Sequence, residues 1–270
     1  AIADAGGANA VSFLQAGTGA VPRTAEDKMR ETVSVHDYGA AGDGTTDDLA
    51  AIQKAINYIA SIGGGYVRLG RGNYKVSSTL TVASDSVWLV GEGPFATKIT
   101  CTANTSACLN FTGWRCGLKN LSIVFTAPAA GATAVLVSGA DFKFNDLFID
   151  NVDIGIDING SDIVNGADFH ITNYLTNGLK ARNGALAVHI SSLIINAGSG
   201  TNGATGGIRL ENFVDAFMAV NGSVLQGLFG LVTEAATFSV GLRPGNSNFT
   251  CVYFDSAVQN PALLKDITNT

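Results

Sequence analysis

The sequence predicts an all-β protein folded as a parallel β-helix, a solenoid in which the chain winds through stacked turns, or rungs. The first observation is a set of degenerate segments that each start with a small residue and then alternate apolar with other side chains. They are Cys108–Gly113, Ala134–Gly139, Gly155–Gly160, Gly178–Asn183, Gly207–Asn212 and Gly230–Ala235. They recur about every 21 to 29 residues, a period typical of solenoids. Alternation with a period of two indicates strands rather than helices.

The second observation is another strand-like segment that interleaves with the first. It occurs at Leu118–Ile123, Phe142–Ile149, Phe169–Leu175 and Val188–Ile195. In all four, a polar residue just precedes an apolar one, and these polar residues are Asn120, Asp146, Asn173 and Ser192. The pattern predicts a short turn that joins two strands and repeats from rung to rung, with successive rungs ~4.8 Å apart.

The N-terminal part, residues 1–33, is expected to be a neck or linker region. Its first ten residues are small and featureless. Thr24 is a candidate N-cap for a short helix, with acidic Glu26 and Asp27 in its first turn and basic Lys28 near its end. A helix this short is unstable alone, so it is expected to dock on something else.

Residues 34–106 are expected to cap the solenoid and lead into it. A strand at Thr32–Val35 is followed by a glycine-rich turn and a second helix, which is capped by Thr46 or Asp47, runs to about Ile62 and stops at Gly63–Gly65. Further strands are expected at Tyr66–Leu69, Lys75–Val76, Thr79–Val82 and Val87–Val90. Residues 107–270 form the rungs, and the solenoid is expected to continue beyond Thr270 because no cap closes its open edge.

Composition excludes several classes of protein. The chain has 270 residues, 33 of them Gly, and a net charge of −6, which argues against a nucleic-acid partner because phosphate binding needs clustered Lys and Arg. No apolar run approaches ~18 residues, so no membrane insertion is expected, and the N-terminus has no signal-peptide pattern. The four cysteines, Cys101, Cys108, Cys116 and Cys251, form no CxxC pair and are expected to be free thiols.

Two stretches carry a resemblance to known families. The run Val35-His36-Asp37-Tyr38-Gly39-Ala40-x-Gly42-Asp43-Gly44-x-x-Asp47-Asp48-x-x-Ala51-Ile52-Gln53 resembles the opening signature of the pectate-lyase superfamily. The run Phe13-Leu14-Gln15-Ala16-Gly17-Thr18-Gly19-Ala20-Val21-x-Arg23-Thr24 is similar to the neck of bacteriophage tailspike and tail-fibre proteins. One departure is Gly70-x-Gly72-x-Tyr74, where the superfamily usually has Pro-x-Gly-x-Tyr.

The resemblance implies a right-handed β-helix in a homotrimeric virion spike, assembled in the host cytoplasm. Such spikes attach to other phage tail proteins through their N-terminal region. Their β-helices bind, and often cleave, polysaccharide of the bacterial surface, either capsule or O-antigen. These properties are implied by the family and not by the repeat period.

The repeats themselves suggest where chemistry lies. If Ile156 and Ile158 point inward, the overlay forms one outward column of Asp157, Lys180 and Arg209, and a second of Asn159, Arg182, Glu211 and Glu234. Glu211 and Glu234 would lie one rung apart, ~5 Å, which suits a retaining glycosidase with carboxyl groups ~5–5.5 Å apart. We therefore expect Glu211, Glu234 and Asp157 to be catalytic. The expected substrate-binding residues are Lys180, Arg182, Arg209 and Trp114.

A structural explanation competes with this site. Asp157–Lys180 and Arg182–Glu211 are also expected to pair as opposite charges on adjacent rungs, a ladder that decorates a solvated face. Other carboxylates, Asp168, Asp215 and Asp255, are candidates for a cleft between subunits. Two further aromatics, Tyr174 and Tyr253, are candidates for stacking on a sugar, although such residues are more often core.

No cofactor or metal is expected. The Gly42–Asp48 loop lacks the ligand spacing of a calcium site and is expected to be a structural turn. The histidines form no ligand pattern, although His170 and His189 fall at similar points of neighbouring rungs. Three functions remain open: a tailspike that hydrolyses polysaccharide, a non-enzymatic receptor-binding or adaptor segment, and a polysaccharide lyase in which Arg182 and Arg209 neutralise a uronate carboxylate.

Overall fold

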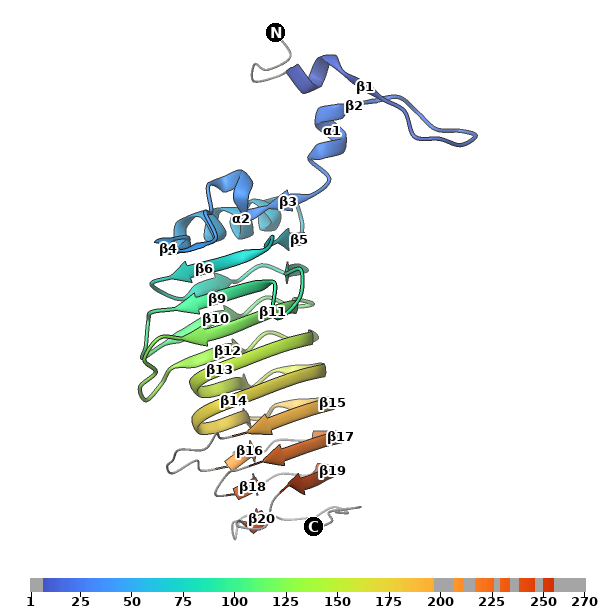
Figure 1. Ribbon diagram of the computed structural model, residues 1–270. Coiled ribbons are helices and arrows are strands. Elements are labelled where there is room, and N and C mark those ends of the chain that lie inside the picture. Colours follow the sequence, from blue (N-terminus) through green and yellow to red (C-terminus); the bar gives the residue numbers. More distant parts are fainter. Residues whose placement is uncertain are drawn as a thin grey trace.

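The chain forms a parallel β-helix, as predicted (Figure 1). The computed structural model describes residues 7–196, 206–210, 217–225, 229–233, 238–245 and 250–254. Among them, one short hairpin is antiparallel and every other strand pair is parallel. Strands stack along the axis, with the N-terminal elements at one end (Figure 1).

Each rung presents three strand faces. Face A consists of β3 (Val33–Ser34), β5 (Gly65–Arg68), β8 (Val87–Val90) and the first parts of six longer strands. These longer strands are β11 (Gly117–Phe125), β13 (Phe142–Asn159), β14 (Asp162–Arg182), β15 (Leu186–Asn196), β17 (Phe217–Leu225) and β19 (Phe238–Gly245). Face B consists of β4 (Asp43–Asp47), β6 (Gly72–Val76), β9 (Thr97–Cys101) and the parts of β11, β13, β14, β15, β17 and β19 that follow face A. Face C consists of β7 (Leu80–Val82), β10 (Ala107–Phe111), β12 (Thr133–Val137), the ends of β13 and β14, β16 (Gly206–Leu210), β18 (Phe229–Thr233) and β20 (Thr250–Phe254).

The interior of the helix is a set of apolar files that run from rung to rung. On face C the register places Leu109 opposite Val135, Val135 opposite Ile156, Ile156 opposite Leu179 and Leu179 opposite Ile208. All five side chains are buried. The predicted overlay of the first segments is therefore confirmed residue by residue, since burial of alternate side chains leaves only one register.

A single residue in the left-handed conformation turns the chain from face A to face B. In four successive rungs, this residue has φ between 49° and 58°: Asn120, Asp146, Asp168 and Ser192. Asn and Asp tolerate this region better than other residues with a Cβ, because their side chains can hydrogen-bond locally. The predicted short turn is thus present. Asn173 was placed in the wrong file, because it lies with Asn151 at the next corner, between faces B and C.

The connection from face C back to face A also contains a file of left-handed residues that lie just before face A, and Gly160, Asn183 and Gly184 earlier in this connection have positive φ as well. The file consists of Gly64, Ser86, Arg115, Asp141, Ile163 and Ala187. Ile163 is unusual there, because a branched Cβ crowds the following carbonyl when φ is positive. Its side chain is 49% exposed, so packing does not explain the choice of residue.

Helix α2 (Leu49–Ser61) covers the end of the stack beside the first rungs (Figure 1). Its buried face includes Ile52, Ile56 and Ile59, at helical spacing as predicted. The predicted N-cap, Thr46 or Asp47, is one to two residues early, because Asp48 is the N-cap residue. Asp47 and the residues before it form β4, which pairs with β6, and β6 starts at Gly72, before the strand predicted at Lys75–Val76.

The neck lies beyond this end and has no buried core of its own. It contains the 3-10 helix η1 (Gly7–Ala10), the hairpin β1 (Ser12–Phe13) and β2 (Arg23–Thr24), and α1 (Ala25–Met29). The Thr24 hydroxyl accepts a hydrogen bond from the Asp27 amide at 3.0 Å, so the predicted N-cap is confirmed. A second 3-10 helix, η2 (Val35–Tyr38), follows β3. No helix in the described ranges has the length and apolarity to cross a membrane.

Candidate functional site

The predicted polar column exists on face C. Asp157 lies opposite Lys180, and Lys180 lies opposite Arg209 on the following rung. Arg182 lies opposite Asn159, which begins the neighbouring column. The register follows from the buried files on either side, because Ile156 and Ile158 face the interior and the residues between and after them face outward.

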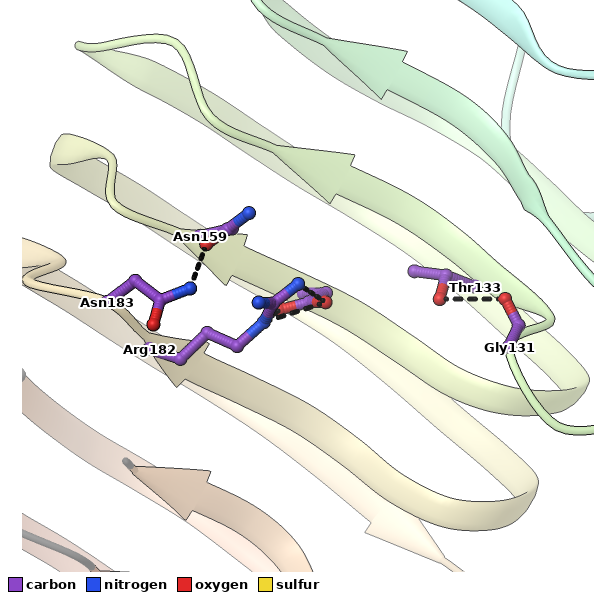
Figure 2. Close-up of polar contacts among 6 residues, drawn as sticks. Gly131, Thr133, Asn159, Arg182 and Asn183 are labelled. Carbon is purple, nitrogen blue, oxygen red and sulfur yellow. Dashed lines mark hydrogen bonds and ion pairs between the residues drawn. The ribbon is translucent and has the colours of Figure 1, made fainter. Parts of the chain in front are cut away.

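The strongest contact in this region joins Asp157 and Arg182. Arg182 donates from Nε to Asp157 Oδ1 at 3.0 Å and from Nη2 to Asp157 Oδ2 at 3.0 Å (Figure 2). Asp157 is only 4% exposed, whereas Arg182 is half-buried. A planar guanidinium that meets a carboxylate through two hydrogen bonds has its orientation fixed as well as its position.

This geometry corrects the predicted ladder. Asp157 and Lys180 are opposite each other, but the described ion pair of Asp157 is diagonal, to Arg182 rather than to Lys180. Diagonal neighbours on adjacent strands lie within reach of a long side chain, and only Arg is long and planar enough to grip both oxygens. The predicted partner of Arg182, Glu211, lies outside the described residues.

The amide of Asn183 adds a second cross-rung contact beside the ion pair. Its Nδ2 donates to Asn159 Oδ1 at 2.6 Å (Figure 2). Asn183 sits in the left-handed region with φ 57°, so the corner after face C aims its side chain back at the previous rung. The sequence analysis did not identify Asn183 as a site residue, although it directly follows Arg182 in the same repeat segment.

The other expected site residues divide into two groups. Lys180 and Arg209 are half-buried on face C, and both make polar or electrostatic contacts. Glu211 and Glu234 lie outside the described residues, as do Asp215 and Asp255. Asp168 is at the corner between faces A and B and accepts a hydrogen bond from Asn145 at 3.2 Å, so it is not part of the face C column.

A second buried aspartate on this side of the helix has a structural role. Asp153 accepts a hydrogen bond from the Gly131 amide at 2.7 Å, and the Gly131 carbonyl accepts one from the Thr133 hydroxyl at 3.3 Å (Figure 2). These bonds fix the turn that leads into β12. Asp153 therefore satisfies a loop amide and does not face the column.

The aromatic candidates differ in exposure. Trp114 is 57% exposed at the corner between faces C and A, where its amide donates to Asp85 at 2.9 Å. It lies on the β10 rung, two rungs before Asp157. Tyr174 is fully buried, and burial raises the pKa of its phenol, so it cannot stack on a sugar. The side chain of Tyr253 lies outside the part that the structure describes.

No metal site was expected, and the described residues contain no cluster of three or more His, Cys, Asp or Glu that would hold an ion. His170 and His189 do not stack as suggested, because His170 is on face B opposite Ile194, whereas His189 is on face A opposite Asn165. Cys101, Cys108 and Cys116 are buried free thiols, as predicted.

The Gly42–Asp48 loop is a structural turn. Asp43 accepts hydrogen bonds from the Thr45 and Thr46 amides, and Asp47 accepts one from the Leu49 amide at 3.2 Å. Asp48, the residue before helix α2, is buried and turns back to accept the amides of Ala41 at 2.6 Å and Gly42 at 3.1 Å. All three carboxylates are therefore used by the fold.

Comparison with known families supports the sequence resemblance. Residues 32–115 match a family described as "Rhamnogalacturonase A/epimerase, pectate lyase-like". The chain is 43% identical over 68 residues to the tail spike protein of Shigella phage Sf6, an alignment that spans 23% of this chain and 11% of that protein. It is 45% identical over 73 residues to a mannuronan C5-epimerase of Azotobacter vinelandii, spanning 24% of this chain and 4% of the epimerase.

Comparison with solved structures covers more of the chain. A tailspike mutant of E. coli bacteriophage HK620, in complex with a pentasaccharide, superposes with a TM-score of 0.77 at 15% identity over 98% of this chain and 54% of that chain. An α-1,3-glucanase from Streptomyces thermodiastaticus superposes with a TM-score of 0.66 at 19% identity over 80% of this chain and 41% of that chain. The chain thus spans about half the length or less of these relatives, and at these identities the likeness concerns the fold.

Proposed function

We propose that this pectate-lyase-like β-helix, whose structural neighbours include phage tailspikes, acts as a tailspike that binds bacterial surface polysaccharide on face C and hydrolyses it. The observation that carries the proposal is the Asp157–Arg182 fork, set in a column with Lys180 and Arg209. Parallel strands place these long polar side chains at a repeat of ~4.8 Å, so that they form a continuous polar strip on the face.

In this proposal, Asp157 is a positioning residue. Its carboxylate is buried and already accepts the guanidinium, so it fixes Arg182 rather than attacking a sugar. Arg182, Lys180 and Arg209 are the proposed donors to sugar hydroxyl or carboxylate oxygens. Trp114 would supply a ring face to a sugar further along the same glycan.

Glu211 and Glu234 are the proposed catalytic pair. What supports them is the backbone register, because the residues just before them, Leu210 and Thr233, are opposite each other on adjacent rungs. Side chains one rung apart suit the ~5–5.5 Å separation of a general acid and a nucleophile in a retaining glycosidase. Two carboxyl groups at that distance also raise one pKa, so that one stays protonated and donates to the leaving oxygen while the other attacks.

The test is incubation of the full chain with purified capsule or O-antigen, with oligosaccharides followed by chromatography. New reducing ends without absorbance near 235 nm indicate hydrolysis, and Glu211→Gln is expected to abolish them while leaving polysaccharide binding intact. Glu26→Gln in the neck is the matched control. Cleavage that survives in Glu211→Gln contradicts the carboxylate pair, and an absorbance near 235 nm indicates a lyase instead.

Binding without cleavage is the second candidate function. It is favoured by one observation: the described carboxylate of the column, Asp157, is engaged by Arg182. In that case Arg182→Lys, which loses the fork, is expected to weaken binding about tenfold, because a hydrogen bond to a charged group contributes about 1.5–3 kcal/mol. Incubation with the chain would then release no oligosaccharides from any polysaccharide tested.

We also propose that the chain works as a homotrimer in the virion tail, attached to other tail proteins through the neck. What supports this is the neck's apolar surface, since Val11, Leu14, Val21 and Met29 are exposed and no core covers them. Contiguous apolar patches, unlike single exposed residues, mark contact surfaces, and we propose that these four side chains form one. Sedimentation at three times the mass of one chain is the expected result, and a monomer at micromolar concentration would contradict it.

A further inference from the structure

Face A differs in charge from the rest of the molecule. Between its two corners, the outward positions from β5 to β15 hold three cations and no carboxylate. These positions are Tyr66, Arg68, Trp88, Val90, Gly117, Lys119, Lys143, Asn145, Asn165, Ala167, His189 and Ser191. In a chain with a formal net charge of −6, a strip without acidic side chains is a local reversal of sign.

Two aromatic rings and an ammonium group meet at the N-terminal end of this strip. Tyr66 and Trp88 are opposite each other on adjacent rungs, with ring centroids 6.2 Å apart. Lys119 Nζ lies 5.5 Å from the Tyr66 centroid and 5.9 Å from the Trp88 centroid. Contacts of this kind hold the ammonium over both rings, and each contributes about 0.5–1 kcal/mol at an exposed site.

A glycine makes room for this arrangement. Gly117 lies opposite Trp88 on the next rung, and a Cβ at Gly117 would come within 2.4 Å of the indole ring. The indole can therefore lie over the backbone of the next rung instead of standing away from the sheet. Tyr66 remains 52% exposed, and Trp88 and Lys119 are half-buried, so part of each ring and the ammonium face solvent.

Arg68 extends the cationic side of the cluster. It is in register with Val90, and Val90 with Lys119, so the two cations flank one small apolar residue on the same file. Arg68 is exposed and has no ion-pair partner within the ranges that the structure describes. Lys143, further along the face, is 3.4 Å from Asp141 and so is partly neutralised.

We propose that Tyr66, Arg68, Trp88 and Lys119 form a second saccharide site, which takes an acidic glycan. The exposed parts of the rings pack against the C–H face of a pyranose, and the Arg68 guanidinium and the Lys119 ammonium pair with a carboxylate or a phosphate on the sugar. A neutral glycan would use the rings alone, and a bare anion would use the cations alone. Selectivity for a sugar that carries an anionic group follows from having both.

The proposal does not depend on the function proposed for face C. Trp88 belongs to face A of the first rungs, whereas Asp157, Lys180 and Arg182 belong to face C of later rungs. The full chain can therefore lose cleavage by Glu211→Gln and keep the acidic site, or lose the acidic site and keep cleavage. The two proposals fail separately.

The test uses tryptophan fluorescence of the full chain in a Trp114→Phe background, so that Trp88 is the remaining tryptophan. The probes are oligogalacturonate as the carboxylated sugar, a phosphorylated mannan as the phosphorylated one, and dextran as the neutral control. Saturable quenching by an acidic probe, weakened by salt, is expected, with dextran at least about tenfold weaker because two charge-assisted contacts are lost. Whichever acidic probe binds more tightly identifies the anionic group.

Substitutions then assign the site. Lys119→Gln and Arg68→Gln are each expected to raise the dissociation constant for the acidic probe about tenfold and to leave that for dextran unchanged. Lys98→Gln, an exposed cation on face B, is the matched control and is expected to change neither. The proposal is overturned if neither acidic probe changes Trp88 emission, if dextran binds equally well, or if Lys119→Gln leaves acidic binding unchanged while circular dichroism shows a folded chain.

Discussion

The N-terminal cap and the later rungs are held together by different means. In the cap, residues 34–76, particular polar groups are buried and each has a specific partner. Asp48 accepts two loop amides, and the Tyr74 hydroxyl lies 3.0 Å from His36 Nε2 and donates to the Gly70 carbonyl at 3.1 Å. In the rungs of residues 142–196, aliphatic and aromatic side chains repeat in files, and a single left-handed residue makes each corner between faces A and B.

This difference explains why the cap has a recognisable sequence motif, whereas the later rungs share only a pattern of apolar and polar positions. A buried carboxylate must keep its partner, because a lost partner leaves an unsatisfied group at a cost of about 1–3 kcal/mol. An interior file accepts many apolar residues of similar volume. The family match accordingly covers residues 32–115, the cap and the first rungs.

The largest effect is expected from Asp48→Ala in the cap. The substitution leaves the amides of Ala41 and Gly42 without the acceptor of two part-buried hydrogen bonds, so the unfolding free energy should fall by about 2–3 kcal/mol. Asp48→Asn keeps one acceptor and should lose roughly half as much. Urea unfolding measures both, and a loss below about 0.5 kcal/mol for Asp48→Ala would show that the cap does not depend on this residue.

A smaller effect of opposite sign is expected at a rung corner. Ile163 has φ 55° and is 49% exposed, so Ile163→Gly removes backbone strain and little packing. Stability should rise by about 1 kcal/mol, seen as a higher unfolding midpoint in urea. Val124→Gly, at a half-buried outward position without positive φ, is the control and should destabilise. A loss of stability in Ile163→Gly would mean that the isoleucine side chain has an unrecognised contact.

The smallest effect is the pH dependence of the cap, because the two carboxylates whose pKa is lowered, Asp43 and Asp47, are exposed and screened by solvent. Hydrogen bonds from the Thr46 and Thr45 amides lower the pKa of Asp43, and the Ser77 hydroxyl lowers that of Asp47. A lowered folded-state pKa stabilises the fold above the unfolded value, near 4, and this stabilisation is lost as pH falls through the folded values. Cap amides should exchange faster at pH 3 than at pH 5, after correction for intrinsic rates, and Asp43→Asn with Asp47→Asn should flatten that change.

Much of the fold could be predicted from sequence because burial has a fixed period. Ile156, Leu179 and Ile208 were placed in one file from alternation alone, and β8 was placed at Val87–Val90. The corner at Asn173 was misplaced because two corners per rung use the same polar residue types, and spacing does not separate them. β4 was read as a loop because its sequence, Asp43–Asp47, contains no apolar residue, and pairing with β6 overrides that preference.

The candidate site was predicted less completely. The column of Asp157, Lys180 and Arg209 follows from register and was correct as an alignment. The ion pair of Asp157 with Arg182 was not predicted, because it depends on side-chain reach along a diagonal and not on which residues are opposite. The aromatic cluster on face A was missed because Tyr66 and Trp88 lie 22 positions apart in different strands, and the room made by Gly117 is visible only in space.

The single-residue corner between faces A and B fixes where this protein can acquire new loops. From β11 to β15 this corner consists of a single residue, so one inserted residue would turn the side chains of the strand that follows to the opposite surface. The connection from face B to face C, by contrast, stretches from Phe125 to Thr133 between β11 and β12 and shortens to a few residues in the next rung. Insertions are therefore best accommodated at the edges that border face C, where a longer loop would cover part of the polar column and change which ligands it can bind.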